Sequence, residues 1–278
     1  MKRRAMISKT LTHSALILLS LLFFFPLYWM IITSLKPNSE ILKLPLRFFV
    51  TNPTLENFTR TFEDGLFVIY YKNNIIVSAL TTLVTIFLAT MASYAFSRYK
   101  FKGSGALQML ILSTQMFPAV VLLISLYTMY SKLKLLNTYA ALILACSTNA
   151  LPMSIWMLKS FFDTVPSSLE ESASLDGASK GYTLVKIIIP LVKPGILAVG
   201  LYSFLLSWED FLWGLNLVTK IDMRTLASGI SLSYLGESAY DWGKAISATV
   251  AAALPVMIAF IFLQKNFIAG LTAGAVKG

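Results

Sequence analysis

Long apolar runs separated by short polar segments dominate this chain. A helix that crosses a membrane needs about 20 mainly apolar residues. Five charge-free runs meet this requirement, and a sixth is interrupted only by Glu209 and Asp210. The pattern therefore predicts an all-α, polytopic membrane protein with six transmembrane helices in one domain, residues 1–278. The predicted spans cover about 12–34, 73–97, 106–130, 136–158, 195–218 and 245–264.

Composition supports a membrane protein and excludes several other classes. Hydrophobic residues make up 56% of the chain and charged residues only 13%, which leaves too little polar surface for a soluble globule and too much apolar surface for a disordered chain. The net charge of +10 fits basic loops facing anionic lipid better than nucleic-acid binding. A single Cys146 and a single His13 provide neither a disulfide nor a metal site, and Cys146 is expected to be a small buried residue.

Lys and Arg in the connections predict the orientation of the spans. If the N-terminus is cytoplasmic, the cytoplasmic segments hold thirteen basic and four acidic residues, a balance of +9. The opposite segments hold ten basic and seven acidic residues, a balance of +3. Both termini are therefore expected in the cytoplasm, with the protein in the cytoplasmic (inner) membrane. The two long outer segments, about 36–72 and 220–244, are not expected to form folded domains of their own.

The cytoplasmic connection of about 160–193 contains signals for a helix–turn–helix. Asp163 or Thr164 is expected to cap a first helix, which Gly177 ends because a helix commonly stops at a left-handed glycine. A second helix of about 179–189 is expected to end at Pro190. The loop would be short, stiff and directly connected to two spans.

A spaced motif in this loop resembles that of a known family. It reads Glu171-Ser172-Ala173, three residues, Gly177, nine residues and then Ile187-Ile188-Ile189-Pro190. This resembles the "EAA" loop of ATP-binding-cassette (ABC) importer permeases, in which Ser172 and Ile189 replace Ala and Leu. Further segments resemble the carbohydrate-uptake branch and its subunits similar to the smaller maltose-transporter permease: Met116-Phe117-Pro118, Trp208 to Leu212, and 270–278.

The resemblance implies a type I ABC importer permease fold and transport of a sugar or oligosaccharide. The implied partners are a second, similar permease, two ATP-binding subunits and an extracytoplasmic solute-binding protein. The chain lacks a Gly-x-x-x-x-Gly-Lys-Ser/Thr motif, so ATP and Mg²⁺ are expected on the partners, and the chain itself is not expected to be an enzyme. The residues expected to couple to the ATPase are Glu170, Glu171, Ser172, Ala173, Asp176, Gly177 and Pro190. Those expected at the ATPase interface in the tail are Gly270, Leu271, Thr272, Gly274 and Lys277.

Charges inside a span usually face a water-filled path, a partner or the bundle interior. Carboxylates accept hydrogen bonds from sugar hydroxyls, and indole rings offer an apolar face to a pyranose. The candidate residues for the solute path are Trp208, Glu209, Asp210, Trp213, Gln115 and Asn149. Glu209 and Asp210 should point about 100° apart on a helix, so one could contact solute while the other pairs with a partner. An alternative remains for each pair of residues. Glu209 and Asp210 could both be hydrated at the outer mouth of the span. Gln115 and Asn149 could serve only to form hydrogen bonds between helices.

Two other function classes make different demands on the sequence. A secondary transporter or channel would use Glu209 and Asp210 as proton or cation sites, and uptake would then depend on an ion gradient rather than ATP. An intramembrane enzyme would need a nucleophile with its base or a metal cluster, and the sequence offers neither.

Overall fold

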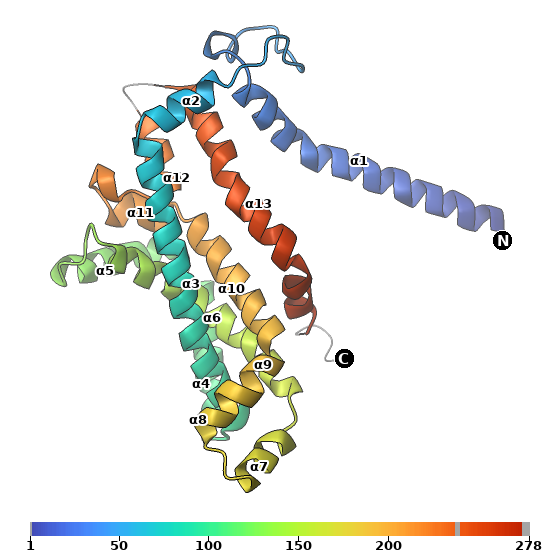
Figure 1. The fold of residues 1–278 in the computed structure, drawn as a ribbon, viewed down its shortest axis with the longest axis vertical. Coiled ribbons are helices and arrows are strands. Elements are labelled where there is room, and N and C mark those ends of the chain that lie inside the picture. The colour runs from blue at the N-terminus through green and yellow to red at the C-terminus, as the bar shows by residue number, and fades with distance from the viewer. Residues whose placement is uncertain (1, 237–239, 274–278) are drawn as a thin grey trace. The chain divides into compact units, whose positions relative to one another are not determined.

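The computed structural model describes residues 2–236 and 240–273, and these residues form helices and connections without a strand (Figure 1). Four helices are long and apolar enough to cross a membrane. They are α1 (Lys2–Ser34), α3 (Leu66–Arg98), α6 (Tyr139–Thr164) and α13 (Trp242–Ala273). Two bent helix pairs raise the total to six if each pair is one span. The predicted all-helical, polytopic class is therefore confirmed.

The third predicted span is not one straight helix. Helix α4 (Ser104–Ser113) and the 3₁₀ turn Thr114–Met116 are followed by α5 (Ala119–Lys132), and the two halves meet at 100°. Phe117 is extended, with φ −82° and ψ 126°, because a residue that precedes a proline avoids the helical region. Pro118 therefore breaks the span predicted for 106–130.

The span predicted for 195–218 is also interrupted. Helix α10 (Lys193–Trp208) ends before Glu209, and α11 (Leu212–Leu217) starts after Phe211. The helical segment that forms a bent apolar pair with α10 precedes it in the chain. This segment, Lys180–Leu191, meets α10 at 78°. The prediction of Glu209 and Asp210 on consecutive positions of one helix was thus wrong, because the backbone leaves the helix at this pair.

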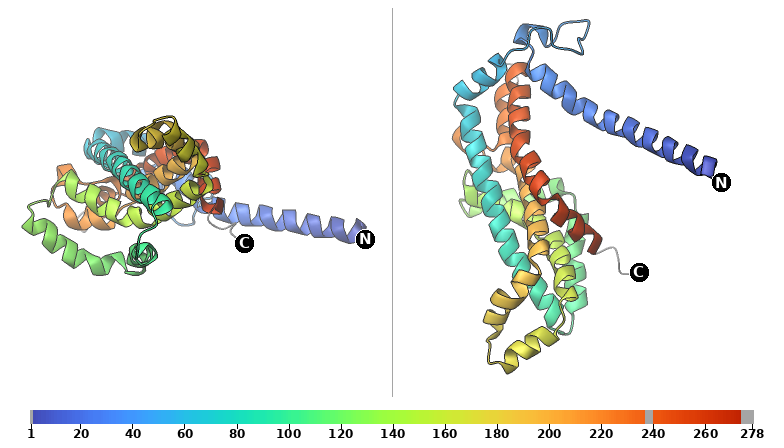
Figure 2. Two further views of the ribbon diagram at one scale, coloured as in Figure 1. Left: turned by 90° about the horizontal axis from the view of Figure 1, so that it is seen from below. Right: turned by 45° about the vertical axis from the view of Figure 1, so that its right-hand side comes forward.

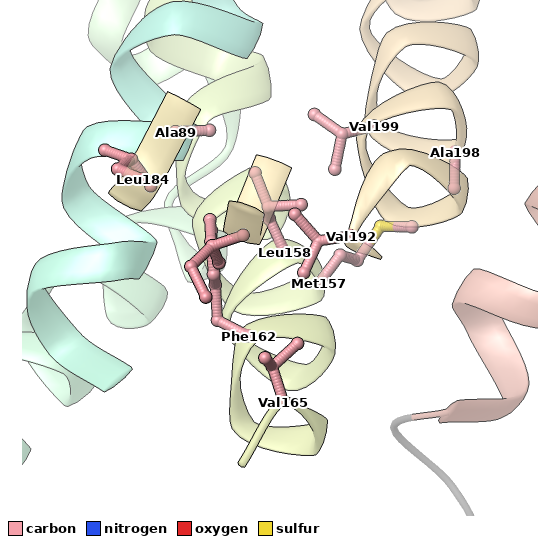
Figure 3. Close-up of a cluster of buried hydrophobic side chains, with 10 residues drawn as sticks. Ala89, Met157, Leu158, Phe162, Val165, Leu184, Val192, Ala198 and Val199 are labelled. Atoms are coloured by element: carbon pink, nitrogen blue, oxygen red, sulfur yellow. The ribbon is translucent and has the colours of Figure 1, made fainter. Parts of the chain in front are cut away.

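The chain divides into two compact units: Met1–Phe67 with Ile230–Ala253, and Val68–Gly229 with Leu254–Gly278. One core cluster of the second unit joins α3, α6 and α10 to the segment before α10 (Figure 3). Phe162 and Leu158 of α6 and Ile188 are fully buried in it. In water, burial of one such side chain stabilises a fold by about 1.5–3 kcal/mol. Lipid is itself apolar, so between membrane helices the stabilisation comes from van der Waals packing instead.

A second cluster of the same unit joins α3, α5, α6 and α11. It contains Val77, Tyr130, Leu142, Cys146 and Trp213, among others. Cys146 is free and buried, which confirms the prediction of a small buried residue. Helix α6 thus contributes to both clusters, and its middle and its C-terminal end support the two sites described below.

In the first unit, polar contacts join the two long segments that the sequence predicts on the outer side. Helix α2 (Glu56–Glu63) carries Arg60, which forms an ion pair with Asp241, and Asp64 accepts a hydrogen bond of 2.7 Å from the Lys244 ammonium. The buried Asn57 side chain donates to the backbone oxygens of Ser34 and Lys36. Polar contacts over about 180 positions therefore join the two segments, and the expectation that neither forms a folded domain of its own stays a prediction.

Candidate coupling loop and solute pocket

The candidate coupling loop begins where α6 ends. Val165 is extended, with φ −86° and ψ 121°, because it precedes Pro166. Helix α7 (Ser168–Leu175) follows with Ser167 at its N-cap position, although the Ser167 side chain makes no capping bond. The predicted cap at Asp163 or Thr164 is wrong, since both residues still belong to α6. The Asp163 carboxylate instead accepts hydrogen bonds of 2.7 Å from Ser97 Oγ and from Lys159 Nζ.

Gly177 ends α7 as the sequence predicts. Its φ is +83°, a left-handed conformation that glycine adopts without steric cost. The Gly177 N–H donates to the Ser174 oxygen at 3.1 Å, and the Ala178 N–H donates to the Ala173 oxygen at 2.9 Å. These two bonds define a Schellman motif, which satisfies carbonyls at the helix end. Ala173 is buried beneath this turn, whereas Ser172 and Asp176 are exposed.

The two neighbouring glutamates of α7 have different surroundings. Glu171 is exposed. Glu170 faces the end of α3, where it accepts a hydrogen bond of 3.0 Å from the Tyr94 hydroxyl and forms an ion pair with Arg98. Both glutamates border a pocket of about 300 Å³ between α3, α7 and α8, which Lys180 also lines. α7 and α8 lie at one end of the second unit (Figures 1 and 2).

The second half of the loop is a helix with a wider turn in its middle. Helix α8 (Lys180–Thr183) starts at Ser179, whose side chain accepts a bond from the Tyr182 N–H at 3.3 Å. A π-turn, Leu184–Ile188, then leads into α9 (Ile189–Leu191). Pro190 lies inside this segment and does not end it, which corrects the sequence prediction. The wider turn accommodates the missing proline N–H, and the sharp bend falls at Val192 instead.

Three of the residues predicted for the solute path share one pocket. Gln115, Asn149 and Trp213 line a pocket of about 310 Å³ beside the break at Pro118. The Gln115 amide donates to the Asn149 backbone oxygen at 2.9 Å, so it joins the 3₁₀ turn to α6. The other lining residues are Thr114, Phe117, Pro118, Ala119, Leu122, Leu126, Ala145 and Thr148.

The remaining candidates of the solute path surround the break between α10 and α11. Trp208 is buried, and its ring stacks on Phe204 at 5.3 Å. Glu209 is exposed. The Asp210 carboxylate accepts hydrogen bonds from the N–H groups of Trp213, at 3.2 Å, and Gly214, at 2.9 Å. Asp210 therefore caps the first turn of α11 and positions the Trp213 that lines the pocket.

Comparisons with known proteins identify the family. Residues 81–272 match the family described as binding-protein-dependent transport system inner membrane component. The chain belongs to this family. It is 36% identical over 254 residues to the sulfoquinovosyl glycerol transport system permease protein SmoH of Agrobacterium fabrum, covering 91% of this chain and 89% of the relative. It is 35% identical to the trehalose/maltose transport system permease protein MalG of Thermococcus litoralis over 99% of both chains.

A solved structure also shares the fold of this permease. It belongs to a bacterial ABC transporter involved in the import of the acidic polysaccharide alginate. The superposition has a TM-score of 0.83 at 20% identity and covers 95% of the permease and 98% of the other chain. The predicted type I importer permease fold is thereby confirmed. The family is one of transport components, which agrees with the expectation that the permease is no enzyme.

Sequence reasoning missed a pair of buried asparagines near the start of α3. The Asn74 amide donates to the Trp208 oxygen at 3.2 Å, and its carbonyl accepts from the Leu226 N–H at 3.3 Å. The Asn73 amide donates to the oxygens of Asp222 and Arg224, both at 2.9 Å. These bonds satisfy backbone groups at the end of α10 and before α12 (Leu226–Tyr234). Two adjacent asparagines at the edge of an apolar run were the available signal, because buried amides need partners.

The C-terminal tail of the permease lies only partly within the described residues. Gly270, Leu271 and Thr272 belong to the backbone of α13, which continues to Ala273. Gly274 and Lys277 lie outside the described residues. The helix therefore extends well beyond the span predicted for 245–264, and the role of the tail stays a prediction.

Proposed function

We propose that this permease pairs with a second, similar permease and moves a sugar or oligosaccharide through the cytoplasmic membrane. Two ATP-binding subunits would drive transport, and an extracytoplasmic binding protein would deliver the solute. The single observation that carries the proposal is the exposed Glu171 on an α7 whose ends are set by Pro166 and Gly177. A short helix of defined orientation with an exposed carboxylate is suited to dock on a basic groove of a partner.

The geometry of the loop supports a mechanism of coupling to the ATP-binding subunits. We propose that α7 seats in a groove of the ATP-binding subunit, with Glu171 on a basic residue there. ATP and Mg²⁺ would be bound and hydrolysed by these partner subunits. Movement of the partner would displace α7, and the segment Lys180–Leu191 would transmit the displacement to α10 across the bend at Val192.

The solute is proposed to be a sugar because of the lining of the pocket and the relatives. Gln115, Asn149 and Thr148 offer amide and hydroxyl groups, and the exposed face of Phe117 adds an aromatic ring. Such groups both donate to and accept from sugar hydroxyls. The named relatives transport sulfoquinovosyl glycerol and trehalose or maltose, which supports the carbohydrate class for this permease.

We further propose that both termini are cytoplasmic, which would place α7 on the side of ATP. The balance of +9 against +3 for Lys and Arg over Asp and Glu supports this orientation. Single cysteines at Ser104, Ser168 and Ser233 in a Cys146→Ser background test it. Only the cysteine at position 233 should react with an impermeant thiol reagent added from outside, and reaction at position 168 would refute the orientation.

The main experiment separates ATP-driven uptake from ion-coupled transport. The permease is reconstituted into proteoliposomes with its partner permease, ATP-binding subunits and sugar-loaded binding protein. Uptake of labelled sugar should require ATP on the side of α7 and persist when ionophores collapse all ion gradients. Uptake that follows an ion gradient without ATP would refute the proposal, and omission of the binding protein serves as the matched control.

A further inference from the structure

The last turn of α3 holds the start of α7 by a group of polar contacts. Arg98 forms an ion pair through Nε with the Glu170 carboxylate, and its Nη2 donates to the Val165 oxygen at 2.9 Å. The second Glu170 oxygen accepts the Tyr94 hydroxyl at 3.0 Å. We call Tyr94, Arg98, Glu170 and the Val165 carbonyl the α3–α7 latch.

The latch is shielded from water and specific in its geometry. The Arg98 and Glu170 side chains are only 13% and 20% exposed. Both carboxylate oxygens of Glu170 are engaged, so its orientation is set from two directions. Charge-assisted hydrogen bonds of this kind are about twice as strong as neutral ones. A lysine at position 98 would replace the arginine only in part, because one ammonium lacks the planar fork that contacts Glu170 and the Val165 carbonyl together.

Without the latch, α7 would be free to pivot. The helix has eight residues and lies between the extended Val165 and the left-handed Gly177, two points at which the chain changes direction. Apart from the latch, α7 buries only the small Ala173 and otherwise contacts the neighbouring α8. A push on the exposed Glu171 would then rotate α7 about its own ends, and little of the movement would reach α3.

We propose that the α3–α7 latch makes α7 and the inner end of α3 move as one body, so that a force on Glu171 reaches α3 directly. Arg98, Tyr94 and Glu170 are positioning residues in this proposal: they touch neither solute nor ATP. The latch stays closed through the transport cycle. The proposal rests on the function proposed above, and it assigns the adjacent glutamates separate tasks, Glu171 toward the partner and Glu170 toward α3.

The first test compares Arg98→Gln and Arg98→Lys with Lys100→Gln in the reconstituted complex. Lys100 is an exposed basic residue just after α3, so its substitution removes the same charge from the loop without touching the latch. Arg98→Gln should lower the number of sugars transported per ATP roughly tenfold, the effect of losing one charge-assisted hydrogen bond. Arg98→Lys should show an intermediate loss, and Lys100→Gln should match the parent. Equal coupling in Arg98→Gln and Lys100→Gln would overturn the proposal.

The second test closes the latch covalently. The pair Arg98→Cys with Glu170→Cys is made in the Cys146→Ser background and joined by a short bifunctional thiol reagent. The unlinked protein should hydrolyse ATP with little transport, and cross-linking should restore at least half of the parent's sugars per ATP. Normal transport before cross-linking, or no restoration after it, would overturn the latch.

Glu171→Ala keeps the two proposals separable. If Glu171→Ala is inactive while Arg98→Gln remains coupled, the latch fails and the coupling role of α7 stands. If Glu171→Ala transports normally, the proposed role of α7 fails first. The amounts of assembled complex, measured by co-purification of the ATP-binding subunits, show that each variant is compared at equal assembly.

Discussion

The proposed coupling loop and the proposed solute pocket both depend on α6, but the chain builds them in different ways. The loop uses residues adjacent in sequence, from Val165 to Ala178, and its turns come from Pro166 and Gly177. The pocket combines a 3₁₀ turn at 114–116, the middle of α6 and Trp213 of α11. The loop therefore has a conformation of its own, whereas the pocket exists only when distant segments meet. Substitutions should separate these two regions by their effects: turnover for the loop, and solute affinity for the pocket.

The largest effect is expected for Glu171→Ala. The substitution removes an exposed carboxylate without changing any internal contact of α7, so sugar uptake should be lost while the protein remains in the membrane. Uptake by right-side-out vesicles and the membrane content of the protein are measured together. Glu171→Gln is the matched variant, which removes the charge and keeps the shape. Uptake at the parental rate in both variants would show that Glu171 has no role in coupling that distinguishes it from Glu170.

Gly177→Val should reduce uptake strongly, and Gly177→Asn should retain most of it. Among the described residues, no heavy atom beyond the two chain neighbours of Gly177 lies within 4 Å of a Cβ added there, so the penalty comes from the backbone at φ +83°. That conformation costs a typical L-residue about 1–2 kcal/mol, and asparagine less. The loop should therefore tolerate a larger side chain at position 177, provided that the residue can adopt a positive φ. Uptake rates at equal protein amounts decide the matter, and the same loss in both variants would contradict this reasoning.

For the pocket, Gln115→Leu should raise the sugar concentration at half-maximal uptake about fivefold, because one hydrogen bond contributes roughly 1 kcal/mol. The maximal rate and the sugars transported per ATP should stay unchanged. Gln108→Leu is the control, since Gln108 contacts Ser104 on α4 and does not line the pocket. A fall in the maximal rate with unchanged half-saturation would place Gln115 with the coupling residues instead.

The smallest effect is expected at the α10–α11 break. Asp210→Ala removes the acceptor for two N–H groups of α11 and should destabilise the protein by about 1 kcal/mol. Glu209→Gln should change stability by less, because Glu209 is exposed. Thermal unfolding in detergent compares the two. A larger loss of stability in Glu209→Gln than in Asp210→Ala, or a change in the range of sugars transported, would contradict this expectation. Glu209, and not Asp210 through its contact with Trp213, would then act in the solute path.

The sequence predicted those features that depend on neighbouring residues. Apolar runs identified α1, α3, α6 and α13, because the length of a span follows from the thickness of the bilayer. The position of Gly177 after the predicted helix indicated a left-handed helix end, which the structure has, since a Schellman motif is formed by consecutive residues. The prediction of a helix end at Pro190 was wrong, because the π-turn that ends two residues earlier accommodates the proline within the helix.

The tertiary structure decided how distant positions meet. The sequence grouped Glu170 with Glu171 as coupling residues, and only the approach of Arg98 and Tyr94 from α3 gives Glu170 a partner and leaves Glu171 exposed. The break after Trp208 likewise depends on Asn74, which lies 134 residues away and satisfies the last carbonyl of α10. Hydrophobic periodicity records which residues avoid water and carries no information on which polar groups face each other. Those pairings, and with them the latch and the pocket, arise when buried donors and acceptors satisfy one another across helices.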